Sequence, residues 1–147
     1  MLKEMDIVLS GHQFKKLCEI KFESIMEKYG LRRIEIEIMQ FISDCGEKDT
    51  AKDIASLQYI SKAHISHSID DLIRKQYLSY VEDAHDRRCI HLSLTEDSKS
   101  IMEEIKIVRQ GIEEILFENI TEQDREIALK VAQKMVSNIG RELKKYR

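Results

Sequence analysis

The sequence predicts a mainly α-helical fold with a small β-hairpin, organised as a winged helix-turn-helix between flanking helices. Two observations support this fold class. A short helical pattern, a turn, a second helical pattern and two strand patterns follow one another between residues 50 and 94. Apolar residues recur at helical spacing on both sides of that segment. We expect one domain over residues 1–147, with a DNA-binding lobe at 31–94 and helical dimerisation regions at 5–29 and 95–146.

The first helical patterns precede the winged unit. Apolar residues between Phe14 and Tyr29 share one helical face, which Gly30 ends. Residues 34–38 alternate as a strand does, but their isoleucines also continue at helical spacing to a stop at Gly46. A helix and a short strand therefore both fit this stretch.

A helix-turn-helix is predicted next. Thr50 can cap a helix, and Asp53 follows three residues later, near the positive helix end. A turn is expected at residues 58–60, and Ser61 can cap the second helix. The apolar positions of that helix recur at helical spacing and are Ile65, Ile69, Leu72 and Ile73.

The second helix has a polar face that suits a DNA groove. Its apolar stripe must face the core, which leaves polar side chains of the first turns, Ser68 included, on the outward face. An α-helix fits the major groove of B-DNA, where cationic and hydroxyl side chains meet phosphates and base edges. The candidate DNA contacts on this helix are Ser61, Lys62, His64, Ser66 and His67.

A β-hairpin is predicted after this helix. Its strands are residues 78–82 and 89–94, and in the second strand apolar residues alternate with polar ones. The polar tip between the strands carries Arg87 and Arg88. A narrow minor groove attracts guanidinium groups, so both arginines are candidate DNA contacts.

Short motifs in this segment resemble the multiple-antibiotic-resistance regulator (MarR) family of bacterial transcription factors. They occur in the family's order and spacing, and with the flanking helices the resemblance covers nearly the whole chain. The motifs are Asp53-Ile54-Ala55, Ser61-Lys62-Ala63-His64-Ile65-Ser66, Ile69-Asp70-Asp71-Leu72, Asp86-Arg87-Arg88 and Leu94-Thr95-Glu96. The resemblance favours the helix over the strand at residues 34–45.

The resemblance implies roles for particular residues. The helix from Ser61 would enter the major groove, and Arg88, which matches the arginine of an Asp-x-Arg motif, would reach the minor groove. Asp86 would brace the wing by pairing with a nearby arginine. The family also implies an obligate homodimer and a possible small-molecule effector bound between its lobes. Many members carry a proline and more arginines on the recognition helix, where this chain has Ala63 and His67, so the operator sequence does not carry over.

Two long amphipathic helices are predicted after the hairpin. One opens at Thr95, and the other opens at Thr121 with Asp124. A second copy of the chain is the simplest cover for their apolar sides, through a twofold interface. Two recognition helices would then bind half-sites about one DNA turn apart, which predicts an inverted-repeat operator. Repression is the expected effect, because a bound dimer near a promoter excludes polymerase.

Composition suits one compact helical domain. Of the 147 residues, 42% are hydrophobic and 35% are charged. We find neither an apolar run long enough for a bilayer nor a secretion signal, so a cytoplasmic location is expected. The formal net charge is -3, and residues 61–94 hold five basic and five acidic residues. DNA affinity must therefore come from the placement of charge.

Histidines concentrate in the winged segment, which contains His64, His67, His85 and His91. Protonation on the DNA face would add positive charge near phosphate, so DNA affinity is expected to rise as pH falls from about 8 to about 6. His64 and His67 have a spacing that can share a metal ion, but no third ligand is evident. We expect no metal and no cofactor.

Alternatives remain for several features. The wing arginines can instead form a structural ion pair with Asp83 or Asp86, and Cys18 or Cys89 can be an oxidant sensor or an incidental thiol. An enzyme is not expected, because the sequence has no glycine-rich phosphate loop, paired-carboxylate motif or nucleophile elbow. The main alternative function is a winged-helix module that binds protein rather than DNA, since the segment is electrically neutral and fold does not fix function.

Overall fold

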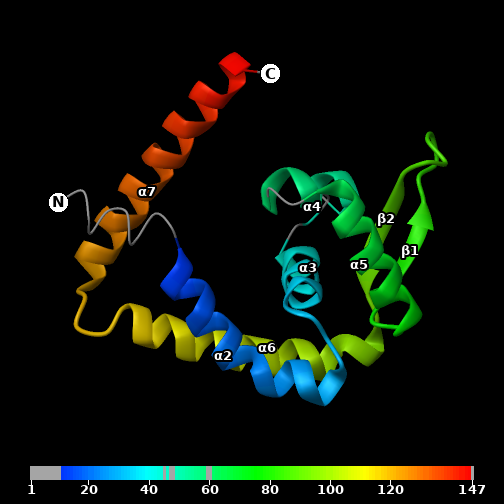
Figure 1. Ribbon diagram of the computed structural model, residues 1–147, viewed down its shortest axis with the longest axis horizontal. Coiled ribbons are helices and arrows are strands. Elements are labelled where there is room, and N and C mark those ends of the chain that lie inside the picture. Colours follow the sequence, from blue (N-terminus) through cyan, green and yellow to red (C-terminus); the bar gives the residue numbers. More distant parts are fainter. Residues whose placement is uncertain (1–10, 45, 47–48, 59–60, 147) are drawn as a thin grey trace. The chain divides into compact units, whose positions relative to one another are not determined.

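The computed structural model describes residues 11–44, 46, 49–58 and 61–146. It contains helices and one two-stranded antiparallel sheet (Figure 1). The elements are α2 (His12–Tyr29), α3 (Arg33–Asp44), α4 (Ala51–Gln58), α5 (Lys62–Arg74), β1 (Leu78–Glu82), β2 (Ile90–Leu94), η1 (Glu96–Ser98), α6 (Lys99–Leu116), α7 (Glu122–Leu143) and η2 (Lys144–Tyr146). The chain divides into two compact units, Met1–Gln110 and Gly111–Arg147. The predicted mainly α-helical fold with a small hairpin is confirmed.

Helices α2 and α3 begin and end close to the predicted residues. Gly30 ends α2 in the left-handed conformation, with φ at 64°, and its N–H donates to the carbonyl of Met26. Residues 34–38 lie in α3, so the helix was the correct choice there. The side chains that these two helices bury in the core include Cys18, Phe22, Ile25, Ile36, Ile38, Met39 and Ile42.

The first helix of the helix-turn-helix has the predicted cap. The Thr50 hydroxyl accepts a hydrogen bond from the backbone N–H of Asp53 at 3.2 Å, and the Asp53 carboxylate accepts one from the backbone N–H of Thr50 at 3.3 Å. This reciprocal pair satisfies two N–H groups that the helix itself leaves without partners. Gln58 is the last residue of α4, and residues 59–60, the rest of the predicted turn, lie outside the described residues.

The hairpin and three helices form the winged lobe. Strands β1 and β2 are antiparallel, from Leu78 opposite Leu94 to Glu82 opposite Ile90. Helix α5 packs against α3, α4 and β1, and α3 packs against β2 (Figure 1). The apolar side chains that these elements bury almost completely include Ile36, Ile54, Ile65, Ile69, Leu72, Leu78 and Leu92. Burial of each such side chain contributes about 1.5 to 3 kcal/mol, which holds α5 firmly in the lobe.

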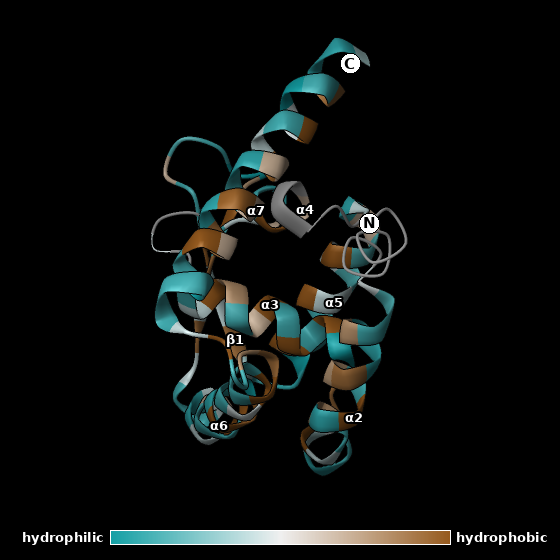
Figure 2. Cartoon of the chain, turned by 90° about the vertical axis from the view of Figure 1, so that its left-hand side faces the viewer, coloured by the Kyte–Doolittle hydropathy of each residue, from teal (hydrophilic) through white to brown (hydrophobic). Residues whose placement is uncertain are grey.

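The second unit consists of the end of α6 and the last helices. Thr121 caps α7 as predicted, because its hydroxyl accepts a hydrogen bond from the backbone N–H of Asp124 at 3.1 Å. Helix α7 buries none of its residues. Apolar positions nevertheless recur along it between hydrophilic ones (Figure 2). No described helix combines the length and apolar character needed to cross a membrane.

Candidate nucleic-acid interface

The first half of α5 carries the predicted contact residues on its exposed side. Ser61 has an extended backbone, and its hydroxyl accepts a hydrogen bond from the backbone N–H of His64 at 3.3 Å, which fixes the start of the helix. The side chains of Lys62, His64 and His67 are exposed, and Ser66 is half-buried. The structure therefore brings the five helical candidates together on one accessible end of α5.

Ser68 does not belong to this exposed face, contrary to our expectation. It is buried, and its hydroxyl accepts a hydrogen bond from the Arg32 guanidinium at 3.3 Å. The reason is helical periodicity, because position 68 follows Ile65 by three residues and precedes Leu72 by four. Ser68 therefore lies within the apolar stripe of α5.

His67 is directed along its own helix toward an acidic residue. Its Nε2 lies 3.5 Å from the carboxylate of Asp71, which also pairs with Arg32 at 2.7 Å and with Arg74. Burial by itself raises the pKa of Asp71, but the charges of His67, Arg74 and Arg32 outweigh it and hold this pKa below the ordinary value of 3.8. Asp71 is thus balanced by cations of the chain itself.

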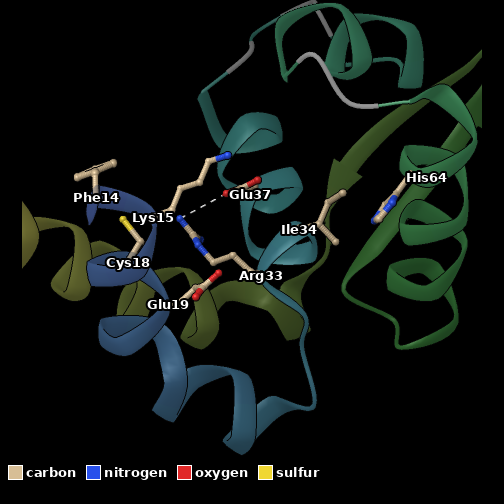
Figure 3. Close-up of a pocket in the computed structure, with 8 residues that line it drawn as sticks. All are labelled: Phe14, Lys15, Cys18, Glu19, Arg33, Ile34, Glu37 and His64. Atoms are coloured by element: carbon tan, nitrogen blue, oxygen red, sulfur yellow. Dashed lines mark ion pairs between the residues drawn. The ribbon is translucent and has the colours of Figure 1, made fainter. Parts of the chain in front are cut away.

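His64 borders a cavity as well as the exposed face of α5. The cavity has a volume of about 520 Å³ (Figure 3). Its lining comes from α2, α3 and α5 and consists of Phe14, Lys15, Cys18, Glu19, Arg33, Ile34, Glu37 and His64. The Arg33 guanidinium lies over the Phe22 ring at 4.3 Å and 3.6 Å from Glu37. Its Nη1 is buried and has no hydrogen-bond partner among the described residues.

The tip of the hairpin is ordered by its own carboxylates. One oxygen of Asp83 accepts hydrogen bonds from the backbone N–H groups of His85 at 2.8 Å and Asp86 at 2.9 Å. The Asp86 carboxylate accepts one from the backbone N–H of Arg88 at 3.0 Å. The side chains of Arg87 and Arg88 are exposed, and neither forms an ion pair with another described residue.

Asp86 makes a different kind of contact from the one that we expected. We predicted an ion pair with an arginine, whereas the observed contact of its carboxylate is with the backbone of Arg88. The short loop explains this, because an aspartate side chain readily reaches an N–H two residues further along the chain. The side chains of both wing arginines are left to point into solvent.

His91 provides a brace that sequence reasoning did not identify. Its Nδ1 lies 2.6 Å from the Asp49 carboxylate, and its Nε2 lies 2.7 Å from the Asp83 carboxylate. The bonds to Asp83 and then Asp49 raise the pKa of His91 above its ordinary value of 6.5, despite the opposing effect of burial. The bond from His91, helped by the N–H groups of His85 and Asp86, lowers the pKa of Asp83 to about 2.

Part of this brace was visible in the sequence. The hairpin register places Val81 opposite His91, and Asp83 follows Val81 by two residues on the same face. A diagonal contact between Asp83 and His91 follows from that geometry. Asp49 lies 42 residues from His91 in sequence, and no local spacing connects them.

A second carboxylate network lies at the other end of α5. Glu35 is fully buried, and its two oxygens lie 2.9 and 3.0 Å from the Lys75 ammonium. The backbone N–H of Arg32 donates to Glu35 at 2.8 Å, and Lys75 also donates to the carbonyl of Gly30 at 2.8 Å. Lys75 therefore connects the end of α5 to the start of α3 and the end of α2.

These contacts pair part of the charge of the winged segment within the lobe. Asp71 and Asp83 are occupied by cationic side chains of the lobe. Lys62, Arg87 and Arg88, in contrast, have no acidic partner within the described part of the chain. Asp70, Glu82 and Asp86 are also exposed and likewise form no ion pair with another described residue, so the interface offers a particular placement of cations rather than an excess of positive charge. Among the residues that the structure describes, no three His, Cys, Asp or Glu side chains are grouped to hold a metal ion.

Comparison with known proteins agrees with this geometry. Residues 31–98 match the model of the winged helix DNA-binding domain. The chain is 25% identical over 139 residues to the HTH-type transcriptional regulator YwaE of Bacillus subtilis (strain 168), covering 94% of this chain and 81% of the relative. It is 26% identical over 103 residues to YpoP of the same organism, another HTH-type transcriptional regulator, with 70% of each chain covered.

Solved structures decide the architecture. A MarR protein from Peptoclostridium difficile is similar with a TM-score of 0.79 and 20% identity, covering 97% of this chain and 92% of that one. The chain has the MarR fold. A MarR-fold structure of MepR from S. aureus, solved in complex with DNA, is similar with a TM-score of 0.72 and 19% identity, covering 86% of this chain and 93% of that one.

The MarR fold confirms the predicted resemblance at the level of architecture. The winged helix DNA-binding domain is likewise confirmed, and its model matches residues 31–98. The matching relatives are named as transcriptional regulators, and the matched domain is a DNA-binding rather than an enzymatic one.

Proposed function

We propose that this protein is a cytoplasmic, homodimeric MarR-type repressor that binds an inverted-repeat operator. One observation carries the proposal: the exposed start of α5 belongs to the same lobe as a hairpin tip whose two arginines form no ion pair with any described residue. In this proposal Ser61, Lys62, His64, Ser66 and His67 enter the major groove.

The wing supplies the second contact. A guanidinium at the tip of a narrow hairpin suits the negative potential of a narrow minor groove. We assign Arg88 to the groove and Arg87 to the neighbouring phosphates. The absence of acidic partners for both arginines among the described residues supports this assignment, because their full charge is available to DNA.

Dimerisation is proposed from the exposed apolar side of the last helix. Val131 is 48% exposed, Ile139 53% and Leu143 45%. These positions recur at helical spacing on α7, and so large an apolar stripe is costly in water. A second copy of the chain that covers it through a twofold axis also places two recognition helices on successive half-sites of DNA.

Effector control is proposed for the cavity beside α5. His64 belongs to both the cavity wall and the proposed DNA face. A small ligand in the cavity can therefore compete with DNA for the position of this side chain. The cationic side chains of Lys15 and Arg33 in the lining favour a ligand with hydrogen-bond acceptors.

Selection from a randomised duplex pool tests the proposed function. The purified protein should enrich an inverted repeat, and its affinity for the enriched duplex should fall steeply with added salt, because phosphate contacts release counterions. Arg88→Ala should reduce this affinity and leave the dimer folded. The matched control is Arg109→Ala, which removes an exposed arginine from α6 that pairs with exposed Asp44.

The outcomes separate the two candidate functions. A palindromic sequence with a steep, Arg88-dependent salt slope supports the repressor. Failure to bind any duplex at low salt, with the protein folded, contradicts it and favours a winged-helix module that binds protein. An affinity that both arginine substitutions reduce equally contradicts the role of Arg88.

A further inference from the structure

The imidazole ring of His91 lies between two carboxylates. Nδ1 is 2.6 Å from an oxygen of Asp49 and Nε2 is 2.7 Å from an oxygen of Asp83. An ionised carboxylate only accepts hydrogen bonds, so both ring nitrogens must carry a hydrogen for both contacts to be favourable. A neutral imidazole has one N–H and one lone pair, and it satisfies only one of the two carboxylates. The geometry therefore requires the imidazolium form.

The two carboxylates come from different parts of the lobe, one beside α4 and the other in the hairpin tip. Asp49 precedes α4, and its backbone carbonyl also accepts a hydrogen bond from the N–H of Leu92 at 3.1 Å. The second oxygen of Asp83 accepts the N–H groups of His85 and Asp86 in the tip. A continuous set of hydrogen bonds thus runs from the start of α4 across β2 to the loop that carries the two arginines.

We propose that protonated His91 is a positioning residue for the wing, and that loss of its proton releases the arginine tip from the helix-turn-helix. This inference rests on the proposed DNA-binding function. While His91 is charged, the tip is attached to the same body as α5, so the two DNA contacts have a fixed separation. When His91 becomes neutral, a lone pair faces a carboxylate and one attachment becomes repulsive. DNA affinity then falls because the wing must be ordered on binding.

The charged groups around His91 favour the protonated ring. Asp49 and Asp83 are the acidic groups that contact it, and together they raise its pKa. On α3, which packs against β2, the acidic side chains have other partners, because Glu37 pairs with Arg33 and Asp44 pairs with Arg109. Stability from this brace is therefore present below the ordinary pKa of 6.5 and is lost as pH rises through the raised pKa.

The brace can be tested first in the free protein. We would follow the ring nitrogens of His91 by NMR from about pH 6 to about pH 9, together with the hydrogen-exchange protection of the Leu92 N–H, corrected for intrinsic exchange. We expect two protonated ring nitrogens below the raised pKa. Protection of Leu92 should fall roughly tenfold as the ring loses a proton, as expected for loss of one charge-assisted hydrogen bond.

Two variants separate the charge of the brace from its shape. In Asp49→Asn, the new amide can donate to Nδ1 while Nε2–H donates to Asp83, so a neutral ring keeps both contacts. The pKa of His91 should fall in this variant, and protection of Leu92 should no longer depend on pH. In His91→Gln, the amide NH2 can donate to one carboxylate, but the amide oxygen then faces the other carboxylate. At every pH the protection of Leu92 in this variant should therefore resemble that of the wild type at high pH. His85→Gln, in the same loop, is the matched control.

DNA binding by the same variants tests the positioning role. With the duplex selected by the wild-type protein, affinity should fall above the His91 pKa by roughly tenfold in the wild type and in His85→Gln. In Asp49→Asn the part of this fall that depends on His91 should be absent, so its affinity should change less over this interval than that of the wild type. His91→Gln should bind weakly at every pH, although its thermal unfolding remains cooperative.

Clear results would overturn the inference. The brace is contradicted if the pKa of His91 is unchanged in Asp49→Asn. It is also contradicted if the hydrogen-exchange protection of the Leu92 N–H does not change as His91 loses its proton. A confirmed brace with equal DNA affinity in wild type and His91→Gln contradicts the positioning role. Absence of binding to any duplex overturns the proposed function and the positioning role together, and the ring titration distinguishes that failure from failure of the brace.

Discussion

Asp71 and Asp83 each pair with cationic side chains of their own lobe. These pairs determine which charged side chains of the winged segment remain available to bind DNA. Asp71 contacts Arg32, Arg74 and His67, and Asp83 contacts His91. Each carboxylate is thereby neutralised close to where DNA would bind. The wing arginines have no such partner within the described residues, so both guanidinium groups remain available at the tip.

At the residue scale, loss of Lys75 should be costly. Lys75→Met leaves the fully buried Glu35 carboxylate with the backbone N–H of Arg32 and with the Arg32 guanidinium at 3.5 Å. We expect a loss of about 2 to 3 kcal/mol in the free energy of unfolding, because the buried charge loses the closer of its two counterions.

Denaturant unfolding measures this effect. The control Lys99→Met removes an exposed lysine from an exposed pair with Glu96, and it should change stability by less than about 0.5 kcal/mol. Adding Glu35→Gln to Lys75→Met should recover part of the loss, because the buried charge is gone. Equal effects of Lys75→Met and Lys99→Met would contradict the role assigned to the buried pair.

Asp83 should contribute to stability in acid. Its pKa is lowered to about 2 from 3.8, so its contribution is present above pH 3.8 and is lost as pH falls toward 2. The thermal midpoint of the wild type should therefore fall more steeply than that of Asp83→Asn between about pH 5 and about pH 2.

The comparison needs a carboxylate that lies outside the brace. Asp70→Asn, at an exposed position of α5, is a suitable control and should reproduce the wild-type slope. Parallel midpoint curves for the wild type and Asp83→Asn would show that the contacts of Asp83 with His91 and the tip are not maintained in solution.

At the scale of elements, α5 combines a structural end and a binding end. Its apolar stripe and its last residues hold it against α3, α4 and β1. Its first turn is exposed and depends on the Ser61 cap. Ser61 therefore affects both the stability of α5 and the proposed DNA contact, and substitutions of Ser61 can separate these two effects.

Ser61→Ala should destabilise the protein by about 1 kcal/mol, because the first turn of α5 loses the acceptor for the His64 N–H. Ser61→Asp should restore stability, since aspartate caps a helix well and its charge favours the helix N-terminus. The same carboxylate should weaken DNA binding, because it would face phosphate. Unfolding curves and duplex titrations on both variants measure the two effects, and normal DNA affinity of Ser61→Asp would place this turn outside the interface.

At the scale of the whole molecule, the proposed dimer explains the exposed apolar side of the last helix. Helix α7 has exposed valines, isoleucines and leucines along its length. A soluble monomer rarely leaves such a stripe in water. The proposed dimer uses this surface to bring two winged lobes to one DNA site, so affinity should depend on an interface distant in sequence from the groove contacts.

Val131→Glu combined with Ile139→Glu should therefore convert the dimer to a monomer and reduce operator affinity strongly, because two charges enter the apolar interface. Sedimentation velocity and duplex titration are the measurements. Lys130→Glu, which helical spacing places on the other side of α7, should leave the dimer intact. A dimer that survives the double substitution would show that α7 is not its interface.

Local rules account for most of the fold predicted from the sequence. The caps at Thr50, Ser61 and Thr121, the stop at Gly30 and the alternation of β2 all depend on neighbours within a few residues. Such interactions hold whatever the rest of the chain does, so a sequence pattern is sufficient to find them. The exposed candidates at the start of α5 and at the wing tip followed from the same periodicities.

Only the tertiary structure decided how the charges are arranged. The sequence alone determined the order of elements, the exposed turn of α5 and the arginine tip. Partners far apart in the chain, such as Asp49 with His91 and Glu35 with Lys75, depend on how helices and the hairpin pack. From the sequence we expected Asp86 to pair with an arginine and Ser68 to lie on the DNA face, and the structure differs at both residues. Whether a polar group meets solvent or another residue is set by long-range packing, because burial makes an unpaired charge costly and selects its partner.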